Sequence, residues 1–178
     1  MAKKKKETTN KLSAQPCPMC GKKTLTLTET KIEVPYFGNV FVFAMNCSNC
    51  KYRKSDVEAE EPKKPCAYTL EITTKKDLNV RVIKSAEATI KIPHIGRMDP
   101  GPASEGFISN IEGIINKFKE QIEHLRDTEE DPAAKKKAKN LLKKLQKVLW
   151  GAEKLKITIE DPTGNSAIVS DKAVKKKL

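Results

Sequence analysis

The sequence predicts a mainly β protein with an α-helical insertion: a small cysteine-rich β unit, then an antiparallel β domain that carries a helical hairpin. Three patterns lead to this prediction. Two Cys-x-x-Cys pairs flank a segment of alternating hydrophobicity, and strand-like alternation resumes from residue 66. Two later segments have apolar residues spaced by three and four, as in amphipathic helices. The length of 178 residues fits one domain with a small appendage.

Composition restricts the class of protein. Charged residues make up 33% of the chain and the formal net charge is +12, so an acidic partner such as RNA has to be considered. The sequence contains no apolar run of about 18 residues, so we expect no membrane-spanning helix. The basic start is not followed by an apolar stretch, which argues against a secretory signal and favours a cytoplasmic protein. In the reducing cytoplasm the five cysteines are not expected to form disulfides.

Part of the positive charge lies at the two ends of the chain. We expect residues 1–15 to be a flexible basic lead and residues 172–178 to be a basic tail. Solubilising ends are the simpler interpretation of these lysines. The alternative is a weak, non-specific contact with RNA through the lysine-rich tails, which would depend strongly on salt.

The cysteine pairs predict a metal site in residues 16–51. Cys17 and Cys20 form one pair, Cys47 and Cys50 the other, and a tight turn in each pair can direct both sulfurs at one ion. The glycine that follows the first pair supplies the backbone freedom that such a turn favours. Four thiolates fill a tetrahedral shell, so we predict one structural zinc ion in a zinc ribbon with a long β-arm.

A redox-active cysteine pair is the main competing interpretation of these motifs. Two pairs without a βαβ pattern argue against it. Cys66 is left over, and we expect it to be a small buried apolar residue rather than a further ligand.

After a charged linker at residues 52–65, the β domain is expected to span residues 66–171. Alternating apolar residues predict its strands around 68–72, 80–82, 88–92, 155–159 and 167–169. A helical hairpin is predicted at about 104–150, with its first helix starting at Ser104 or Ser109. The second helix is expected to begin at Asp131-Pro132 and to end at Gly151.

No catalytic constellation is recognisable. The sequence has two histidines, His94 and His124, but no His-x-His pair, no serine nucleophile elbow and no phosphate-binding loop, so we expect no enzymatic activity. A small-molecule site near His94 and Arg97, in the Pro/Gly-rich loop at residues 93–106, is a third and weaker hypothesis.

Candidate partner contacts lie on the β-arm tip and on two rigid loops. Exposed aromatic residues favour interface anchoring, although those of the arm tip can equally pack on the β domain. The turn at residues 161–166 is rich in residues that specify turns, and loops on a strand scaffold often carry contacts. The candidates are Tyr36, Phe37, Arg97, Asp161, Thr163 and Asn165.

Four segments of the chain form a recognisable combination. They are the two cysteine pairs at their long spacing, Ile92-Pro93 leading through Pro100-Gly101 into a helix, the SNIEGII segment at residues 109–115, and the EDPTGNS segment at residues 160–166. Together they resemble the ZPR-type zinc-finger family over about residues 16–170. The third segment is similar to the family's Val-Glu-Gly-Leu-Ile element, and the fourth to its Asp-Asp-Pro-x-Gly-Asn-Ser element.

The resemblance implies a fold and a function. Its fold would be a zinc ribbon followed by a double-stranded β-helix-like domain with an inserted helical hairpin. Eukaryotic members carry two tandem copies of this unit, and the single copy here is similar to shorter archaeal members. Family members bind translation elongation factor 1-alpha, a GTPase, and assist its folding without known catalytic residues. We therefore expect a zinc-dependent protein-binding module. The alternative is a ribbon that binds nucleic acid or the ribosome, suggested by the positive charge.

Overall fold

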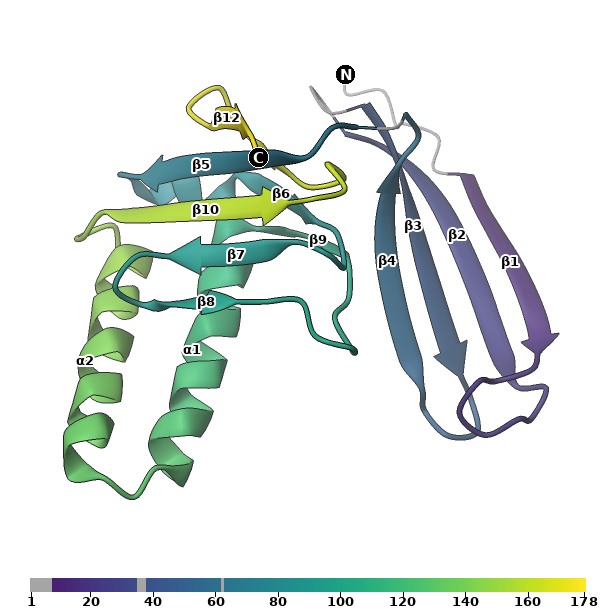
Figure 1. The fold of residues 1–178 in the computed structure, drawn as a ribbon, viewed down its shortest axis with the longest axis horizontal. Coiled ribbons are helices and arrows are strands. Elements are labelled where there is room, and N and C mark those ends of the chain that lie inside the picture. The colour runs from purple at the N-terminus through teal and green to yellow at the C-terminus, as the bar shows by residue number, and fades with distance from the viewer. Residues whose placement is uncertain (1–7, 35–37, 62) are drawn as a thin grey trace.

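The computed structural model describes residues 8–34, 38–61 and 63–178 and contains two β units joined along one seam (Figure 1). The first unit is a ribbon of four strands: β1 (Thr8–Gln15), β2 (Leu25–Val34), β3 (Gly38–Cys47) and β4 (Arg53–Ala59). The second is a β domain with strands β5 (Cys66–Ile72), β6 (Arg81–Lys84), β7 (Thr89–Ile92), β8 (Gly96–Met98), β9 (Phe107–Asn110), β10 (Leu155–Asp161), β11 (Ala167–Val169) and β12 (Val174–Lys177). Its helices are the short 3-10 helix η1 (Lys75–Asn79) and the α-helices α1 (Ile111–Thr128) and α2 (Pro132–Leu149).

The ribbon is an antiparallel sheet in the order β1-β2-β3-β4. The central hairpin runs in register from Leu25 opposite Cys47 to Val34 opposite Gly38, as the sequence predicts for the β-arm. The two outer strands differ from expectation, because β1 lies in the expected flexible lead and β4 lies in the expected linker. Both are edge strands held by backbone pairing, and no alternation of hydrophobicity marks them. The side chains of β1 are almost all exposed, whereas β4 buries only Val57.

The β domain has a five-stranded sheet, β12-β5-β10-β7-β8, and a three-stranded sheet, β11-β6-β9. Strand β10, which follows the hairpin in sequence, pairs along its whole length with β5, which opens the domain. The strand–hairpin–strand organisation predicted from the sequence is therefore confirmed. Buried aliphatic side chains from both sheets and both α-helices form one core, which includes Leu70, Ile90, Ile157, Ile115 and Leu145.

The helical hairpin is present, but its first helix begins later than predicted. Helix α1 starts at Ile111, where the Asn110 side chain caps it by accepting a hydrogen bond of 2.8 Å from the Gly113 N–H. Phe107 and Ile108 instead belong to β9, which pairs with β6. This strand is four residues long, and its apolar positions fit a helical period as well as a strand, so periodicity could not separate the two.

The second helix agrees with the prediction at both ends. Asp131 caps α2 by accepting hydrogen bonds of 3.1 and 3.0 Å from the N–H groups of Ala133 and Ala134, and Pro132 takes the first helical position. Gly151 follows the helix with a φ of 76°, the left-handed conformation that glycine adopts most readily. No helix among residues 8–34, 38–61 and 63–178 combines the length and the hydrophobicity that crossing a membrane requires.

The end of the chain is structured where the sequence analysis expected a basic tail. Residues 174–177 form β12, which pairs with β5 at the edge of the larger sheet. The Lys175 ammonium lies 5.3 Å from the centroid of the Tyr68 ring. Lys172 forms an ion pair of 2.7 Å with Asp77, a buried residue in η1. The sequence did not indicate this order because the partners of these lysines, Asp77 and Tyr68, lie far away along the chain.

Asp77 is expected to make stability depend on acid pH. Its carboxylate accepts hydrogen bonds from Lys172 and from the backbone and side chains of Thr73 and Thr74. The Lys172 contact, followed by the backbone N–H groups, lowers the pKa of Asp77 far below its usual range despite burial. The stabilisation is thus complete above the unfolded-state pKa of about 3.9 and is lost as pH falls below it.

The substitution Asp77→Asn measures this contribution. We expect it to lower the free energy of unfolding by about 2 kcal/mol at pH 7, and the difference from wild type should shrink between pH 5 and pH 3. Urea unfolding at several pH values gives the comparison. Asp171→Asn, an exposed aspartate in the same region, is the control and should change little. A pH-independent difference for Asp77→Asn would contradict the assignment.

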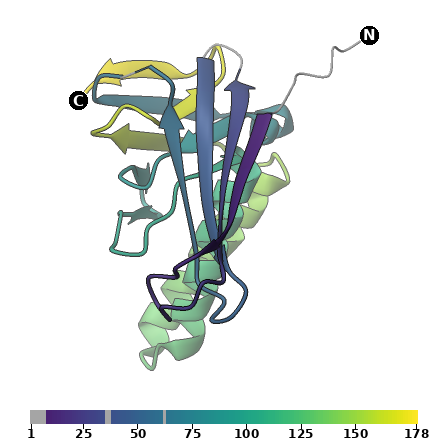
Figure 2. The same cartoon turned by 90° about the vertical axis from the view of Figure 1, so that its right-hand side faces the viewer.

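The ribbon joins the β domain at one end only. Val34, Val40 and Val57 at that end are fully buried with Ile83 and Ala167 of the smaller sheet. Figure 2 shows that the ribbon extends from this seam in the same direction as the helical hairpin. The opposite end of the ribbon, where β1 meets β2 and β3 meets β4, is therefore free of the β domain (Figure 1).

Hydrogen bonds from the loops complete the seam. The Gly106 N–H donates to the Ser55 carbonyl at 3.0 Å, and the Ser55 hydroxyl donates to the Gly106 carbonyl at 2.9 Å. The Ala86 N–H donates to the Asp56 carboxylate at 3.1 Å. Because buried polar groups rarely stay unpaired, these contacts fix the orientation of β4 against the β domain.

Candidate metal centre

The four predicted ligands meet at the free end of the ribbon. Cys17 and Cys20 lie in the turn between β1 and β2, and Cys47 and Cys50 lie in the turn between β3 and β4. Their Sγ atoms all lie within 4.8 Å of one another. The four cysteines predicted as metal ligands are therefore the ones that the fold brings together.

The two cysteine turns have matching backbone geometry. In each, the carbonyl of the first cysteine accepts an N–H four residues later: Gly21 donates to Cys17 at 2.8 Å, and Lys51 donates to Cys47 at 3.1 Å. In each, the N–H of the first cysteine also donates to the carbonyl five residues later, at 2.9 Å. Gly21 and Lys51 both adopt a left-handed conformation, with φ of 69° and 62°. Glycine adopts this conformation without strain in the first turn, whereas Lys51 adopts it with strain in the second. Backbone strain of this kind is common at functional sites.

The sulfur geometry fits a tetrahedral ion. Cys17 Sγ lies 3.6 Å from Cys50 Sγ, and Cys20 Sγ lies 3.8 Å from Cys47 Sγ. Four thiolates at about 2.3 Å from a central zinc ion would lie about 3.8 Å apart. All four cysteines are free thiols rather than disulfides. The cluster therefore has the ligand type, number and spacing of a four-cysteine zinc site.

Electrostatics also favour a cation in the cluster. The Thr24 hydroxyl, 3.2 Å from Cys47 Sγ, and nearby backbone N–H groups lower the pKa of Cys47 to about 6. The Tyr52 N–H lowers the pKa of Cys50, but desolvation and the neighbouring sulfurs outweigh it and raise that pKa to about 12. Four thiolates so close together repel one another, and a bound divalent cation removes that repulsion and displaces the remaining protons.

Little apolar packing supports this end of the ribbon. Its buried cluster consists of Cys17, Leu25 and Cys47, with partly buried neighbours on the adjacent strands and turns. The two turns are further linked by the Ser48 N–H, which donates to the Thr24 carbonyl at 3.1 Å. With four thiolates bound, a tetrahedral ion keeps no position for water or substrate, so the geometry is that of a structural ion.

Other predicted site residues do not join the cysteine cluster. Tyr36 and Phe37 lie outside the described residues. Arg97 pairs with Asp99 on the surface beside β8, where both side chains are largely exposed. His94 is exposed with a φ of 63°. Cys66 is buried in β5, as expected, and burial raises the pKa of its thiol.

Most polar groups of the turn at residues 161–166 bond within the protein, while Pro162 is exposed and Thr163 and Asn165 are half-buried. Asp161 is fully buried and accepts hydrogen bonds from the Thr163 N–H and hydroxyl and from the Ser85 hydroxyl, at 2.7–2.8 Å. The Asn165 side chain accepts a 3.1 Å hydrogen bond from the Ala59 N–H in the ribbon. Asp161 is therefore unavailable as a partner contact, and the turn serves to hold the ribbon on the β domain. Sequence alone indicated a turn but not the direction of its polar groups.

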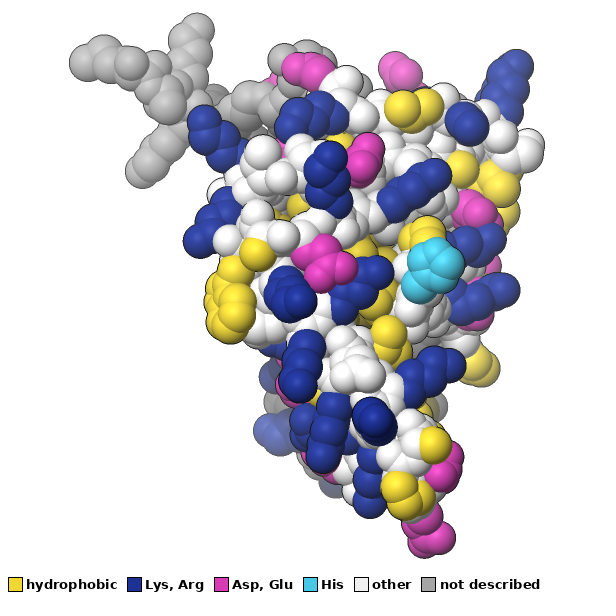
Figure 3. Space-filling view, turned by 90° about the vertical axis from the view of Figure 1, so that its left-hand side faces the viewer, with side chains coloured by type: hydrophobic (Ala, Val, Ile, Leu, Met, Phe, Trp, Pro, Cys, Tyr) yellow, Lys and Arg dark blue, Asp and Glu magenta, His cyan; other side chains and the backbone are white. Residues whose placement is uncertain are grey.

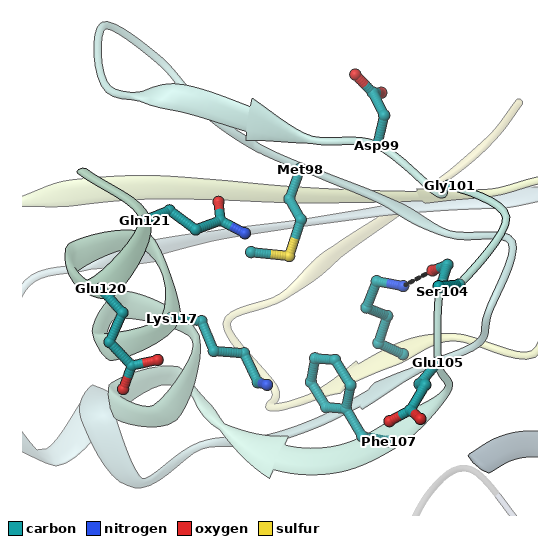
Figure 4. A pocket seen from close by; sticks show the side chains of 11 residues that line it. Met98, Asp99, Gly101, Ser104, Glu105, Phe107, Lys117, Glu120 and Gln121 are labelled. Atoms are coloured by element: carbon teal, nitrogen blue, oxygen red, sulfur yellow. Dashed lines mark hydrogen bonds between the residues drawn. The ribbon is translucent and has the colours of Figure 1, made fainter. Parts of the chain in front are cut away.

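The β domain holds a second polar site, which was not predicted from the sequence. Lys84, Ser104, Phe107 and Lys117 line a cavity beside α1 and β9 (Figure 4). The available signal was Lys84 at the end of the apolar strand Arg81–Lys84, where the alternation with Val82 places it on the core side. Neither His94 nor Arg97 lines this cavity.

Comparison with known proteins identifies the family. A family model described as the ZPR1 zinc-finger domain matches residues 11–62, and one described as the ZPR1 jelly-roll domain matches residues 76–177. A ZPR1-like protein of Methanocaldococcus jannaschii is 40% identical over 157 residues, covering 87% of this chain and 79% of that protein. A ZPR1-like protein of Pyrococcus horikoshii is 40% identical over 167 residues, covering 91% and 75%. The zinc finger chaperone zpr1 of Schizosaccharomyces pombe is 29% identical over 156 residues, covering 85% of this chain but 33% of that protein. With both family domains matched along most of its length, the chain belongs to the ZPR1 family of zinc-finger proteins.

Proposed function

We propose that this protein is a cytoplasmic, zinc-dependent binding module that engages translation elongation factor 1-alpha and assists its folding, without catalysing a reaction. The four-thiolate cluster is the observation that carries the proposal. It fits one ion, closes the coordination shell and holds a protruding ribbon in shape. The name of the fission yeast relative, a zinc finger chaperone, supports a chaperone-like role.

The ribbon offers an apolar groove for such a partner. Leu12, Leu27, Phe43 and Met45 line a groove of about 270 Å³ on the sheet face formed by β1, β2 and β3. Leu12 is 62% exposed and lies beside the other apolar residues of the groove, so its surface is accessible to a partner. Apolar and aromatic residues on a rigid sheet are typical of the centre of a protein interface.

Binding of the purified proteins tests the proposal. Zinc-loaded protein should form a complex with elongation factor 1-alpha from the same organism, measured by isothermal titration calorimetry, and should raise the yield of the factor when it refolds from denaturant. Leu12→Glu should weaken the complex by about tenfold or more. Leu125→Glu, which changes an equally exposed leucine on the helical hairpin, should leave it within about twofold. Absence of any complex while zinc is bound would refute the proposal.

Binding to RNA remains the second candidate, and one surface favours it. Figure 3 shows that the face of the molecule bearing α2 carries more lysine and arginine side chains than acidic ones. Exposed lysines of α2 contribute to this face, namely Lys136, Lys137, Lys139, Lys143 and Lys147. Under this alternative, RNA affinity should fall steeply with salt and should drop further when Lys139 and Lys143 are replaced by glutamate. Tight binding that selects one RNA sequence would favour this function over the first.

A further inference from the structure

A cavity in the β domain has the character of a binding site. It has a volume of about 350 Å³ and lies between α1, β9 and the loop that connects β8 to β9 (Figure 4). Polar and apolar side chains line it together. In Figure 4, Lys117, Gln121, Met98 and Phe107 extend toward its centre. Cavities of this size with a few convergent polar groups are typical of small-molecule sites.

Lys84 is the most unusual of the lining residues. It is 2% exposed, and its ammonium donates one hydrogen bond of 2.9 Å to the Ser85 carbonyl and a longer one of 3.4 Å to the Ser104 hydroxyl, the dashed line in Figure 4. Among residues 8–34, 38–61 and 63–178 it forms no ion pair within 4.0 Å. Burial lowers the pKa of this ammonium. The carboxylates of Asp161 and Asp56 attract this ammonium but form no direct ion pair with it. A buried charge without a contact ion pair is costly, and such residues are concentrated at functional sites.

A second ammonium group lies at the same aromatic ring. The Nζ atoms of Lys84 and Lys117 lie 5.7 and 4.8 Å from the centroid of the Phe107 ring. The acidic residues of the lining are directed elsewhere. Asp99 pairs with Arg97, the Glu105 carboxylate lies 3.4 Å from the Ser55 hydroxyl of the ribbon, and Glu120 points away from the cavity in Figure 4. The charge that faces the cavity is therefore positive.

We propose that this cavity binds a small phosphate monoester, with its phosphate between Lys84 and Lys117 and its apolar part against Phe107 and Met98. A phosphate monoester carries close to two negative charges at neutral pH, which matches two ammonium groups. Its three terminal oxygens are hydrogen-bond acceptors for both ammonium groups. The site is separate from the cysteine cluster, so it adds a ligand to the proposed binding function without depending on it.

Titration with phenyl phosphate tests the site. We expect saturable binding with a Kd tighter than about 1 mM, and shifts of amide NMR signals centred on Ser104 and Phe107. Lys84→Met and Lys117→Met should each weaken binding by about tenfold or more, because each removes a charge-assisted contact. Lys139→Met, on the exposed face of α2, should leave the Kd within about twofold. Benzoate, which carries a single charge, should bind at least about fivefold more weakly than phenyl phosphate.

Thermal stability without ligand supplies an independent readout. Lys84→Met keeps the length of the side chain but removes the unpaired buried charge, so we expect its Tm to rise while anion binding is lost. A lysine with a purely structural role would lower the Tm when replaced. The proposal is overturned if phenyl phosphate gives no saturable shifts in wild type, if the control variant loses binding equally, or if Lys84→Met is less stable than wild type.

Discussion

Removal of the metal is expected to unfold the free end of the ribbon while the β domain stays folded. The reason is the distribution of apolar contacts. The metal end has a buried cluster of only Cys17, Leu25 and Cys47, whereas the seam end buries Val34, Val40 and Val57 against the β domain. A unit with so little core depends on its metal for folding. The β domain has its own large core, which does not include the ribbon.

Hydrogen exchange after chelation measures this effect. Amides of residues 17–31 and 43–53 should lose nearly all protection, and amides of β5, β7 and β10 should keep theirs. Cys47→Ser should reproduce the loss and reduce bound metal from about one ion per chain to near zero. Cys66→Ala is the matched control, because this cysteine lies in β5 and should leave metal content unchanged. Full protection of the ribbon after chelation would contradict this account.

Replacing Gly164 is expected to have the second large effect on stability. This residue lies where the turn of residues 161–166 meets residues 63–64, which connect the ribbon to the β domain. Its φ is 74°, a conformation that other residues adopt with strain. A Cβ atom here would lie 2.4 Å from the Lys64 carbonyl oxygen and 2.9 Å from the Lys63 carbonyl carbon. Both are backbone atoms, so the clash cannot be relieved by rotating a side chain. Gly164→Ala should therefore displace the backbone of residues 63–64 from the turn.

We expect Gly164→Ala to lower the free energy of unfolding by about 3 kcal/mol, combining backbone strain and steric overlap. Urea unfolding monitored by circular dichroism gives the value. Gly101→Ala is the control, since a Cβ atom at Gly101 meets nothing within 4 Å and its φ is not positive. Its effect should stay within about 0.5 kcal/mol. Equal stability of the two variants would show that the turn does not hold the ribbon as described.

The metal ligands and the helical hairpin could be predicted because local spacing specifies both. A Cys-x-x-Cys pair is a short-range geometric requirement, and the cap at Asp131-Pro132 satisfies local backbone groups. The edge strands β1, β4 and β12 could not be predicted in the same way. Their sequences are polar and charged, so no alternation of hydrophobicity marks them. Strand β12 pairs with β5, which lies far away in sequence, whereas β1 and β4 add to the outer edges of the predicted hairpin strands β2 and β3.

The direction of polar side chains was the other feature that sequence could not supply. The turn of residues 161–166 was recognised, but its side chains satisfy hydrogen bonds from Ser85 and Ala59, which come from other parts of the chain. Lys84 was missed for the same reason, since a lysine at the end of a strand is normally exposed. Such roles depend on tertiary contacts: the alternation in residues 81–84 places Lys84 on the core side but does not name its partners, and the turn pattern of residues 161–166 does not give the direction of its side chains.

X-ray absorption at the zinc edge on purified, reduced protein is the most direct test of the metal centre. The proposed protein-binding function depends on this centre. We predict a single shell of four sulfur atoms at about 2.3 Å, with no oxygen or nitrogen ligand, from one ion per chain. A spectrum that requires a bound water or an imidazole, or a protein whose ribbon is folded without zinc, would contradict the account.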